Sequence, residues 1–79
     1  MDNDEKVEIL ASLMPKGWEV NPNSEGAEVV SKDGKKKQLL LQDSSVVIDR
    51  KSFTYKVFEY SASLIVSFIL QCFDGKIRL

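Results

Sequence analysis

The side chains that usually carry catalysis are nearly absent from this 79-residue sequence. It contains no histidine, which removes the usual general base near neutral pH and the commonest metal ligand. Cys72 is the only cysteine, so a zinc site would have to be built almost entirely from carboxylates. The four glycines stand singly, so no glycine-rich loop is available to hold a phosphate. We therefore expect a protein without catalytic activity, cofactor or metal.

The carboxylates and the single thiol give no contrary signal. Glu25 and Glu28 lie close in sequence, and Asp43 and Asp49 bracket a strand, but neither pair has a spacing typical of metal binding or acid–base catalysis. Cys72 falls among apolar residues, so we expect a buried structural thiol. A lone cysteine also excludes an internal disulfide, and an acidic N-terminus is unlike a secretory signal. Together these features predict a cytoplasmic setting.

The densest cluster of charge surrounds Asp33-Gly34, a dipeptide that favours a two-residue hairpin turn because both positions tolerate positive φ. Four lysines flank it: Lys32, Lys35, Lys36 and Lys37. A hairpin would present four ammonium groups at one tip, suited to phosphates or to an acidic protein surface. Lysines in this position also prevent unwanted strand pairing. A net charge of −1 and the lack of aromatic residues between these lysines argue against nucleic acid.

The longest apolar segment is the C-terminal third, residues 53–73, which contains no Gly, Pro, Asn or Asp. Its polar residues recur every three or four positions from Ser52 to Gln71, which predicts a helix with one narrow polar stripe. Ser52 would be the N-cap and Gly75 the C-terminal cap. The alternative is a C-terminal β-hairpin turning at Asp74-Gly75, because β-branched and aromatic residues also suit strands.

A helix here would carry two apolar rows. The first row comprises Phe53, Val57, Tyr60, Leu64, Phe68 and Cys72, and the second comprises Phe58, Ile65, Ile69 and Phe73, with Val66 and Leu70 beside them. A small sheet covers only one side of a helix. We expect the second row to remain exposed as a partner-binding surface, unless the N-terminal helix and the tail at residues 77–79 cover it. Trp18 is a further candidate, either as an interface anchor or as a core residue that pins a helix to the sheet.

The remaining sequence predicts an N-terminal helix and a small antiparallel sheet. The helix covers residues 4–14, capped by Asp2 or Asn3 and ended by Pro15 and Gly17. Extended segments are expected at residues 18–20, 27–32, 35–42 and 46–48, with a turn at 21–24. The prediction is one small α+β domain: a helix, three or four antiparallel strands, and a long apolar helix across one side of the sheet.

These features together favour a small non-catalytic protein-binding module. It would dock as a homodimer or against a larger protein, in the manner of an inhibitor, immunity or adaptor protein of bacterial or phage type. A domain of this length buries only about 60% of its unfolded surface, so docking would add useful stability. The alternative is nucleic-acid binding by the hairpin at residues 32–37. A membrane span is not expected, because the predominantly apolar residues 60–73 fall short of the ~20 residues that a bilayer requires.

Overall fold

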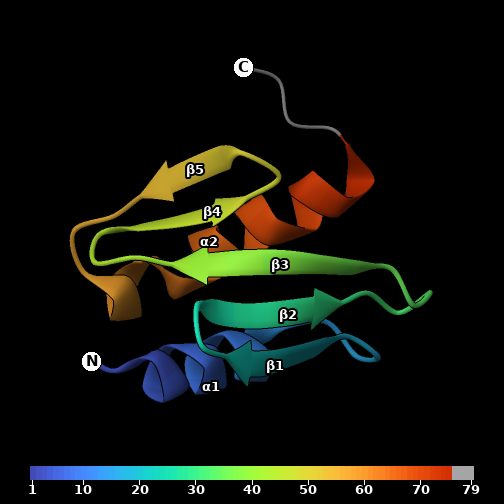
Figure 1. Ribbon diagram of the computed structural model, residues 1–79, viewed down its shortest axis with the longest axis horizontal. Coiled ribbons are helices and arrows are strands. Elements are labelled where there is room, and N and C mark those ends of the chain that lie inside the picture. Colours follow the sequence, from blue (N-terminus) through green and yellow to red (C-terminus); the bar gives the residue numbers. More distant parts are fainter. Residues whose placement is uncertain (76–79) are drawn as a thin grey trace.

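The computed structural model describes residues 1–75, and these form a helix, five strands and a second helix (Figure 1). The elements are α1 (Asn3–Leu13), β1 (Glu19–Asn23), β2 (Gly26–Val30), β3 (Lys36–Leu41), β4 (Ser45–Ile48), β5 (Lys51–Thr54) and α2 (Phe58–Asp74). Each strand pairs antiparallel with its neighbours in sequence, in the order β1-β2-β3-β4-β5. The predicted α+β fold is confirmed, with a fifth strand that the sequence did not reveal.

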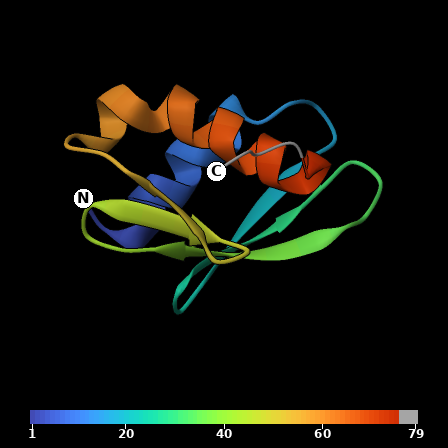
Figure 2. The same ribbon diagram turned by 90° about the horizontal axis from the view of Figure 1, so that it is seen from above.

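Two layers make up the molecule: both helices lie on one face of the sheet (Figure 2). α1 packs against β1 and α2, and α2 lies over β4. Between the layers lies a core of fully or nearly buried apolar side chains: Val7, Leu10, Val20, Ala27, Val29, Leu39, Val46, Ile48, Phe58, Ala62, Ile65, Val66, Ile69 and Cys72. Within residues 1–75, no helix is both long and apolar enough to cross a membrane.

α1 begins and ends close to where the sequence predicts. Asp2 is the N-cap, and its carboxylate accepts a hydrogen bond of 2.8 Å from the Glu5 backbone N–H. The Glu5 carboxylate accepts in return from the Asp2 backbone N–H, which completes a capping box. Val7 and Leu10 of this helix are buried in the core. A local signal thus fixes the start of the helix, and its apolar stripe fixes its orientation.

The hairpin between β2 and β3 is confirmed, but its turn has three residues rather than two. The Ser31 N–H donates to the Lys35 carbonyl oxygen (2.8 Å), and the Gly34 N–H donates to the Ser31 carbonyl oxygen (2.9 Å). Gly34 has φ +90°, whereas Asp33 does not adopt a positive φ. The loop is therefore the three-residue kind, in which only the last position is left-handed. The Ser31 hydroxyl donates to the Asp33 carboxylate, and this hydrogen bond lowers the pKa of Asp33.

β1 extends through part of the predicted turn, because Pro22 is accommodated in it. β1 is an edge strand, where a residue without a backbone N–H is tolerated. The Asn23 side-chain oxygen accepts from the Glu25 N–H (3.2 Å) and the Gly26 N–H (3.1 Å), which moves the turn to residues 24–25. At Gly26, with φ +155°, a Cβ would lie 2.2 Å from the Leu39 carbonyl oxygen, so only glycine fits.

The strand that the sequence did not predict, β5, follows a tight turn that lacks the usual turn residues. Ile48 pairs with Lys51, so only Asp49 and Arg50 connect β4 to β5. Both have positive φ, +52° and +66°, as a type I′ hairpin turn requires. Asn-Gly or Asp-Gly is the usual signature of this turn, and arginine rarely takes the left-handed conformation. The sequence therefore did not predict a turn at Asp49-Arg50.

The C-terminal apolar segment is a helix, as predicted, but it begins at Phe58 rather than Phe53. Ser52 is not its N-cap, because Ser52 lies in β5. The N-cap is Val57, whose side chain has no acceptor and makes no capping hydrogen bond. The C-terminal cap is Gly75 in the left-handed conformation, as expected. The hairpin alternative is wrong, since its first arm is helical. The predicted tail at 77–79 lies outside the described residues.

Candidate docking surface

The two apolar rows of α2 differ in exposure from the prediction. Phe58, Ile65 and Ile69, expected to form an exposed partner-binding row, are buried in the core, and Ile65 and Ile69 have no exposed surface at all. Phe73 is half-buried. These residues face the sheet and α1, which together cover the side of α2 on which they lie. The expected exposure of this row is therefore wrong for Phe58, Ile65 and Ile69, and the alternative, in which the N-terminal helix covers the row, agrees with the structure.

Three residues of the row expected to face the sheet are instead exposed, whereas Cys72 at its end is buried. Tyr60 is 85% exposed, Leu64 59% and Val57 44%, and Phe68 is half-buried with its ring 5.7 Å from the ring of Phe53 on β5. We call Val57, Tyr60, Leu64 and Phe68 the α2 flank. Phe68, its last member, packs towards β5 through the Phe53 ring, and the described chain has no third helix to cover the flank, because α1 lies on the other side of α2 from β5 (Figure 1).

Geometry explains why sequence reasoning chose the wrong row. Both rows have the residue spacing of a buried helix face, so periodicity cannot show which of the two is buried. The choice depends on which side of α2 receives α1, and that is set by the tertiary arrangement of the two helices on one sheet face.

Trp18 behaves as the core alternative predicts. Its side chain is half-buried and packs against the core, with its ring edge-on to the ring of Phe73 at 4.9 Å. This contact fastens the loop after α1 to the C-terminal end of α2. Lys37 lies over the same Phe73 ring, its Nζ 5.6 Å from the ring centroid.

The four lysines of the hairpin do not converge on one tip. Lys36 and Lys37 are consecutive in β3, so their side chains point to opposite faces of the sheet. Lys37, on the helix side, forms a salt bridge with Asp49. The stem of Lys32 lies against Gly17, where a Cβ would be 3.1 Å from the lysine Cγ. Of the predicted cluster, Lys32, Lys35 and Lys36 are exposed and form no described ion pair, whereas Lys37 is only partly exposed.

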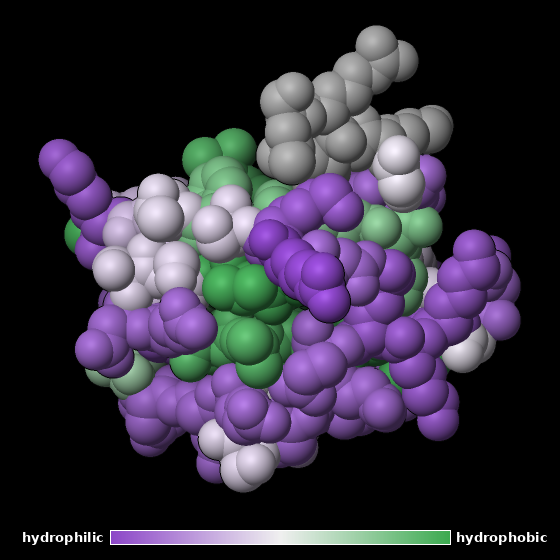
Figure 3. All heavy atoms as spheres, turned by 45° about the horizontal axis from the view of Figure 1, so that its top comes forward, coloured by the Kyte–Doolittle hydropathy of each residue, from purple (hydrophilic) through white to green (hydrophobic). Residues whose placement is uncertain are grey.

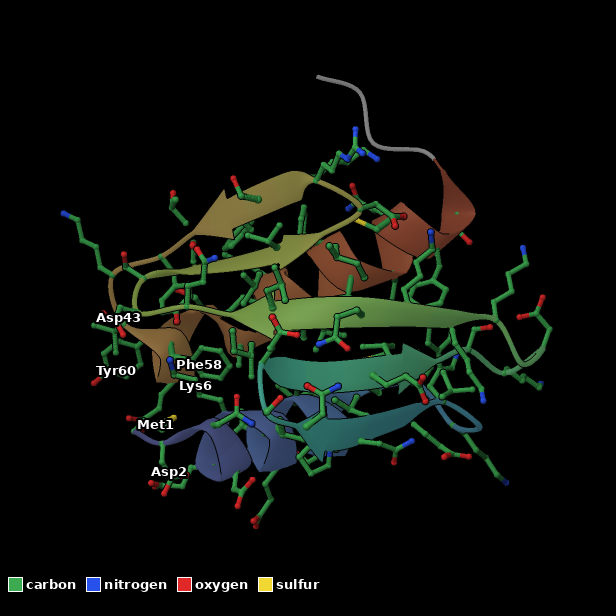
Figure 4. The ribbon with its side chains drawn as sticks, in the orientation of Figure 1. Met1, Asp2, Lys6, Asp43, Phe58 and Tyr60 are labelled. Atoms are coloured by element: carbon green, nitrogen blue, oxygen red, sulfur yellow. The ribbon has the colours of Figure 1, made fainter. Side chains whose placement is uncertain are left out.

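A concave surface of about 450 Å³ lies where the N-terminal ends of α1 and α2 meet the turn between β3 and β4 and the loop after β5, and Lys6 and Phe58 form part of its lining. Lys6 stands beside Phe58, with Nζ 5.6 Å from the ring centroid (Figure 4). The same Nζ donates to the Gln42 carbonyl oxygen (3.3 Å) and to the Tyr55 hydroxyl (3.4 Å). Because Lys6 is already bound by the protein's own groups, it serves to join α1 to the loops around α2.

The sheet face away from the helices is mostly polar. Asn23 and Gln38 exchange side-chain hydrogen bonds across it, the shorter being 2.8 Å. Leu40 and Val47 are paired across β3 and β4 and are only half-buried. Figure 3 shows hydrophobic side chains gathered at the centre of the view and ringed by hydrophilic ones. The paired Leu40 and Val47 make a small patch, in contrast to the longer α2 flank.

Cys72 is a buried thiol, as predicted, with 4% of its surface exposed. Burial raises the pKa of this thiol, which disfavours the reactive thiolate. Lys51 and Lys37 lower it to a lesser extent. The side chain therefore serves packing rather than chemistry.

Comparison of the chain with models of known protein families, with characterised proteins and with solved structures found no significant match. The surface itself must then supply the argument for function. Of the residues singled out in the sequence, the structure brings Trp18 and Phe73 together and places Phe58, Ile65 and Ile69 in the core. The α2 flank is the surface that sequence reasoning did not single out.

Proposed function

We propose that this chain is a small non-catalytic module that docks to protein through the α2 flank. The observation that carries the proposal is the exposure of three consecutive members of one helical row, led by Tyr60 at 85% and Leu64 at 59%. Burial of a leucine or phenylalanine side chain is worth about 1.5–3 kcal/mol. Because these side chains are exposed in the free domain, a partner that buries them would add this free energy to the stability of the complex.

The proposed class is a stoichiometric inhibitor, immunity or adaptor protein of bacterial or phage type, acting in the cytoplasm. The absence of histidine and the buried, unactivated Cys72 support a role without catalysis. The margin of stability expected for a chain of this length is about 4–12 kcal/mol, so docking would contribute a sizeable fraction of it. Binding of nucleic acid through residues 32–37 has less support, because Lys36 and Lys37 point to opposite faces of the sheet.

A photo-crosslinking amino acid at position 60 tests the proposal. Tyr60 is replaced by benzoylphenylalanine, which resembles tyrosine in shape and reacts with neighbouring C–H bonds on irradiation. The same replacement at Leu13, which is 47% exposed on α1, is the matched control. Specific adducts in extracts of the native host are expected from position 60 and not from position 13. Equal or absent labelling at both positions contradicts docking through the α2 flank.

A further inference from the structure

We infer that the α2 flank binds the α2 flank of a second copy of this chain, as an antiparallel helix pair about a twofold axis. This inference rests on the proposed function and names the partner of the same surface. In a twofold interface, if residue i of one copy contacts residue j of the other, then residue j of the first copy also contacts residue i of the second. The surface must therefore be complementary to itself. The α2 flank meets this condition in both shape and charge.

Three of the four flank residues are spaced symmetrically about Leu64; Val57, the fourth, faces Gln71 of the second copy in this register. Tyr60 precedes it by four residues and Phe68 follows it by four. With the axis at Leu64, antiparallel helices place Leu64 against Leu64 and Tyr60 against Phe68 of the second copy, twice. The matched part of the flank, from Tyr60 to Phe68, spans about 12 Å at ~1.5 Å per residue of helix. Aromatic pairs of this kind are favourable beyond the area that they bury.

Charge also favours a second copy. None of the four flank residues is charged, so two flanks meet without repulsion. Lys56 precedes the helix and Asp74 ends it, and both side chains are exposed. An antiparallel arrangement brings Lys56 of each copy towards Asp74 and the negative end of the helix dipole of the other. A parallel arrangement would place like charges together, so the charges select the antiparallel one.

The size of the surface predicts a weak dimer. A standard interface buries about 800 Å² on each partner, whereas one helical flank supplies less. We therefore expect a dissociation constant of about 10–1,000 µM, in the range of small transient interfaces. Such a dimer forms only at high protein concentration, and the experiment must reach that concentration.

Sedimentation equilibrium from ~10 µM to ~1 mM, a range set by the expected affinity, provides the first measurement. The wild type is expected to form a dimer at the upper end. Leu64→Asp should raise the dissociation constant at least ~10-fold, as loss of a central apolar contact does. The matched control Leu13→Asp, on the exposed surface of α1, should change it by less than ~2-fold. A wild type that stays monomeric to the highest concentration overturns the inference.

A charge exchange tests the register. Lys56→Asp and Asp74→Lys should each raise the dissociation constant by about 2–5-fold, because each change affects two symmetric surface pairs. The double variant Lys56→Asp/Asp74→Lys should restore the wild-type value. If the double variant is no tighter than the single ones, the antiparallel register is wrong.

Disulfide trapping provides a readout that does not depend on destabilisation. Leu64→Cys should form a covalent dimer on mild oxidation, because two copies of this position meet at the axis. Leu13→Cys, equally conservative and also exposed, should form none. Equal trapping of both variants would indicate random collision and would contradict the proposed axis.

The failures of the two proposals can be told apart. A monomeric wild type that still gives position-60 adducts with another protein refutes self-association and leaves docking through the α2 flank in place. A monomeric wild type without such adducts refutes both proposals.

Discussion

Two adjacent residues of α2, Leu64 and Ile65, offer a sharp test of how this helix is oriented. Leu64 is 59% exposed, whereas Ile65 has no exposed surface. We predict that Ile65→Ala costs about 3–4 kcal/mol, because it removes buried methyl and methylene groups and leaves a cavity. Leu64→Ala should change the stability of the monomer by about 0.5 kcal/mol or less. The two substitutions are chemically matched, so their difference isolates burial.

The effect is large on the scale of this small chain. Average unfolding entropies per residue imply that 1 kcal/mol shifts the Tm of a 79-residue domain by about 6 °C. Ile65→Ala should therefore lower Tm by about 20 °C. Because that loss approaches the whole margin expected for the chain, Ile65→Val, with an expected cost of about 0.5–1.5 kcal/mol, provides a milder version.

Urea denaturation followed by fluorescence measures all three variants, since Trp18 is the only tryptophan and its ring contacts Phe73 at the end of α2. Protein concentration is kept at ~1 µM, below the expected range of dissociation constants, so that monomer stability is measured. Equal losses at positions 64 and 65 would refute the reasoning. A greater loss at position 64 would mean that the exposed row is in fact the core row.

Three further predictions concern the backbone and the thiol. Arg50→Gly should raise the free energy of unfolding by about 1 kcal/mol in the same denaturation assay, because glycine adopts the left-handed turn without strain; a loss of stability would show that the Arg50 side chain makes a favourable contact. Gly26→Ala should lower stability by about 3 kcal/mol or more, since its Cβ would meet the backbone of β3, and near-neutral stability would contradict the local geometry. Burial raises the pKa of Cys72, so its contribution is fully present below the unfolded value near 9 and is lost as pH rises above it; Cys72→Ala should reduce the fall in stability above pH 9, and an unchanged pH profile would contradict this.

Most of the fold could be predicted from the sequence because local residues mark where its helices and turns begin and end. Asp2 and Gly75 cap helices, and Asp33-Gly34 marks a hairpin, so the corresponding elements begin and end close to their predicted positions. β5 was missed because its turn uses Asp49-Arg50, a pair whose left-handed geometry is imposed by the pairing of β4 with β5 rather than by local preference. Its residues were consequently assigned to the following helix.

The sequence predicted the exposed surface of α2 less well than it predicted the fold. The sequence correctly indicated that α2 is more apolar than a small sheet can cover, which is why a docking surface was predicted on it. It did not indicate which row is left over, because Leu64 and Ile65 satisfy the same helical periodicity on adjacent rows. That decision lies in the packing of α1 beside α2, a contact between elements at opposite ends of the chain.

The neighbour-to-neighbour order of the five strands has a consequence for folding kinetics. Every strand closes on the one before it through a short turn, so the sheet can form stepwise with little loop-closure entropy at each step. The contact between α1 and α2 is different, since it spans almost the whole described chain. We therefore expect this contact to form after the strand pairs, and the part of the sheet that α2 covers stays open to water until then.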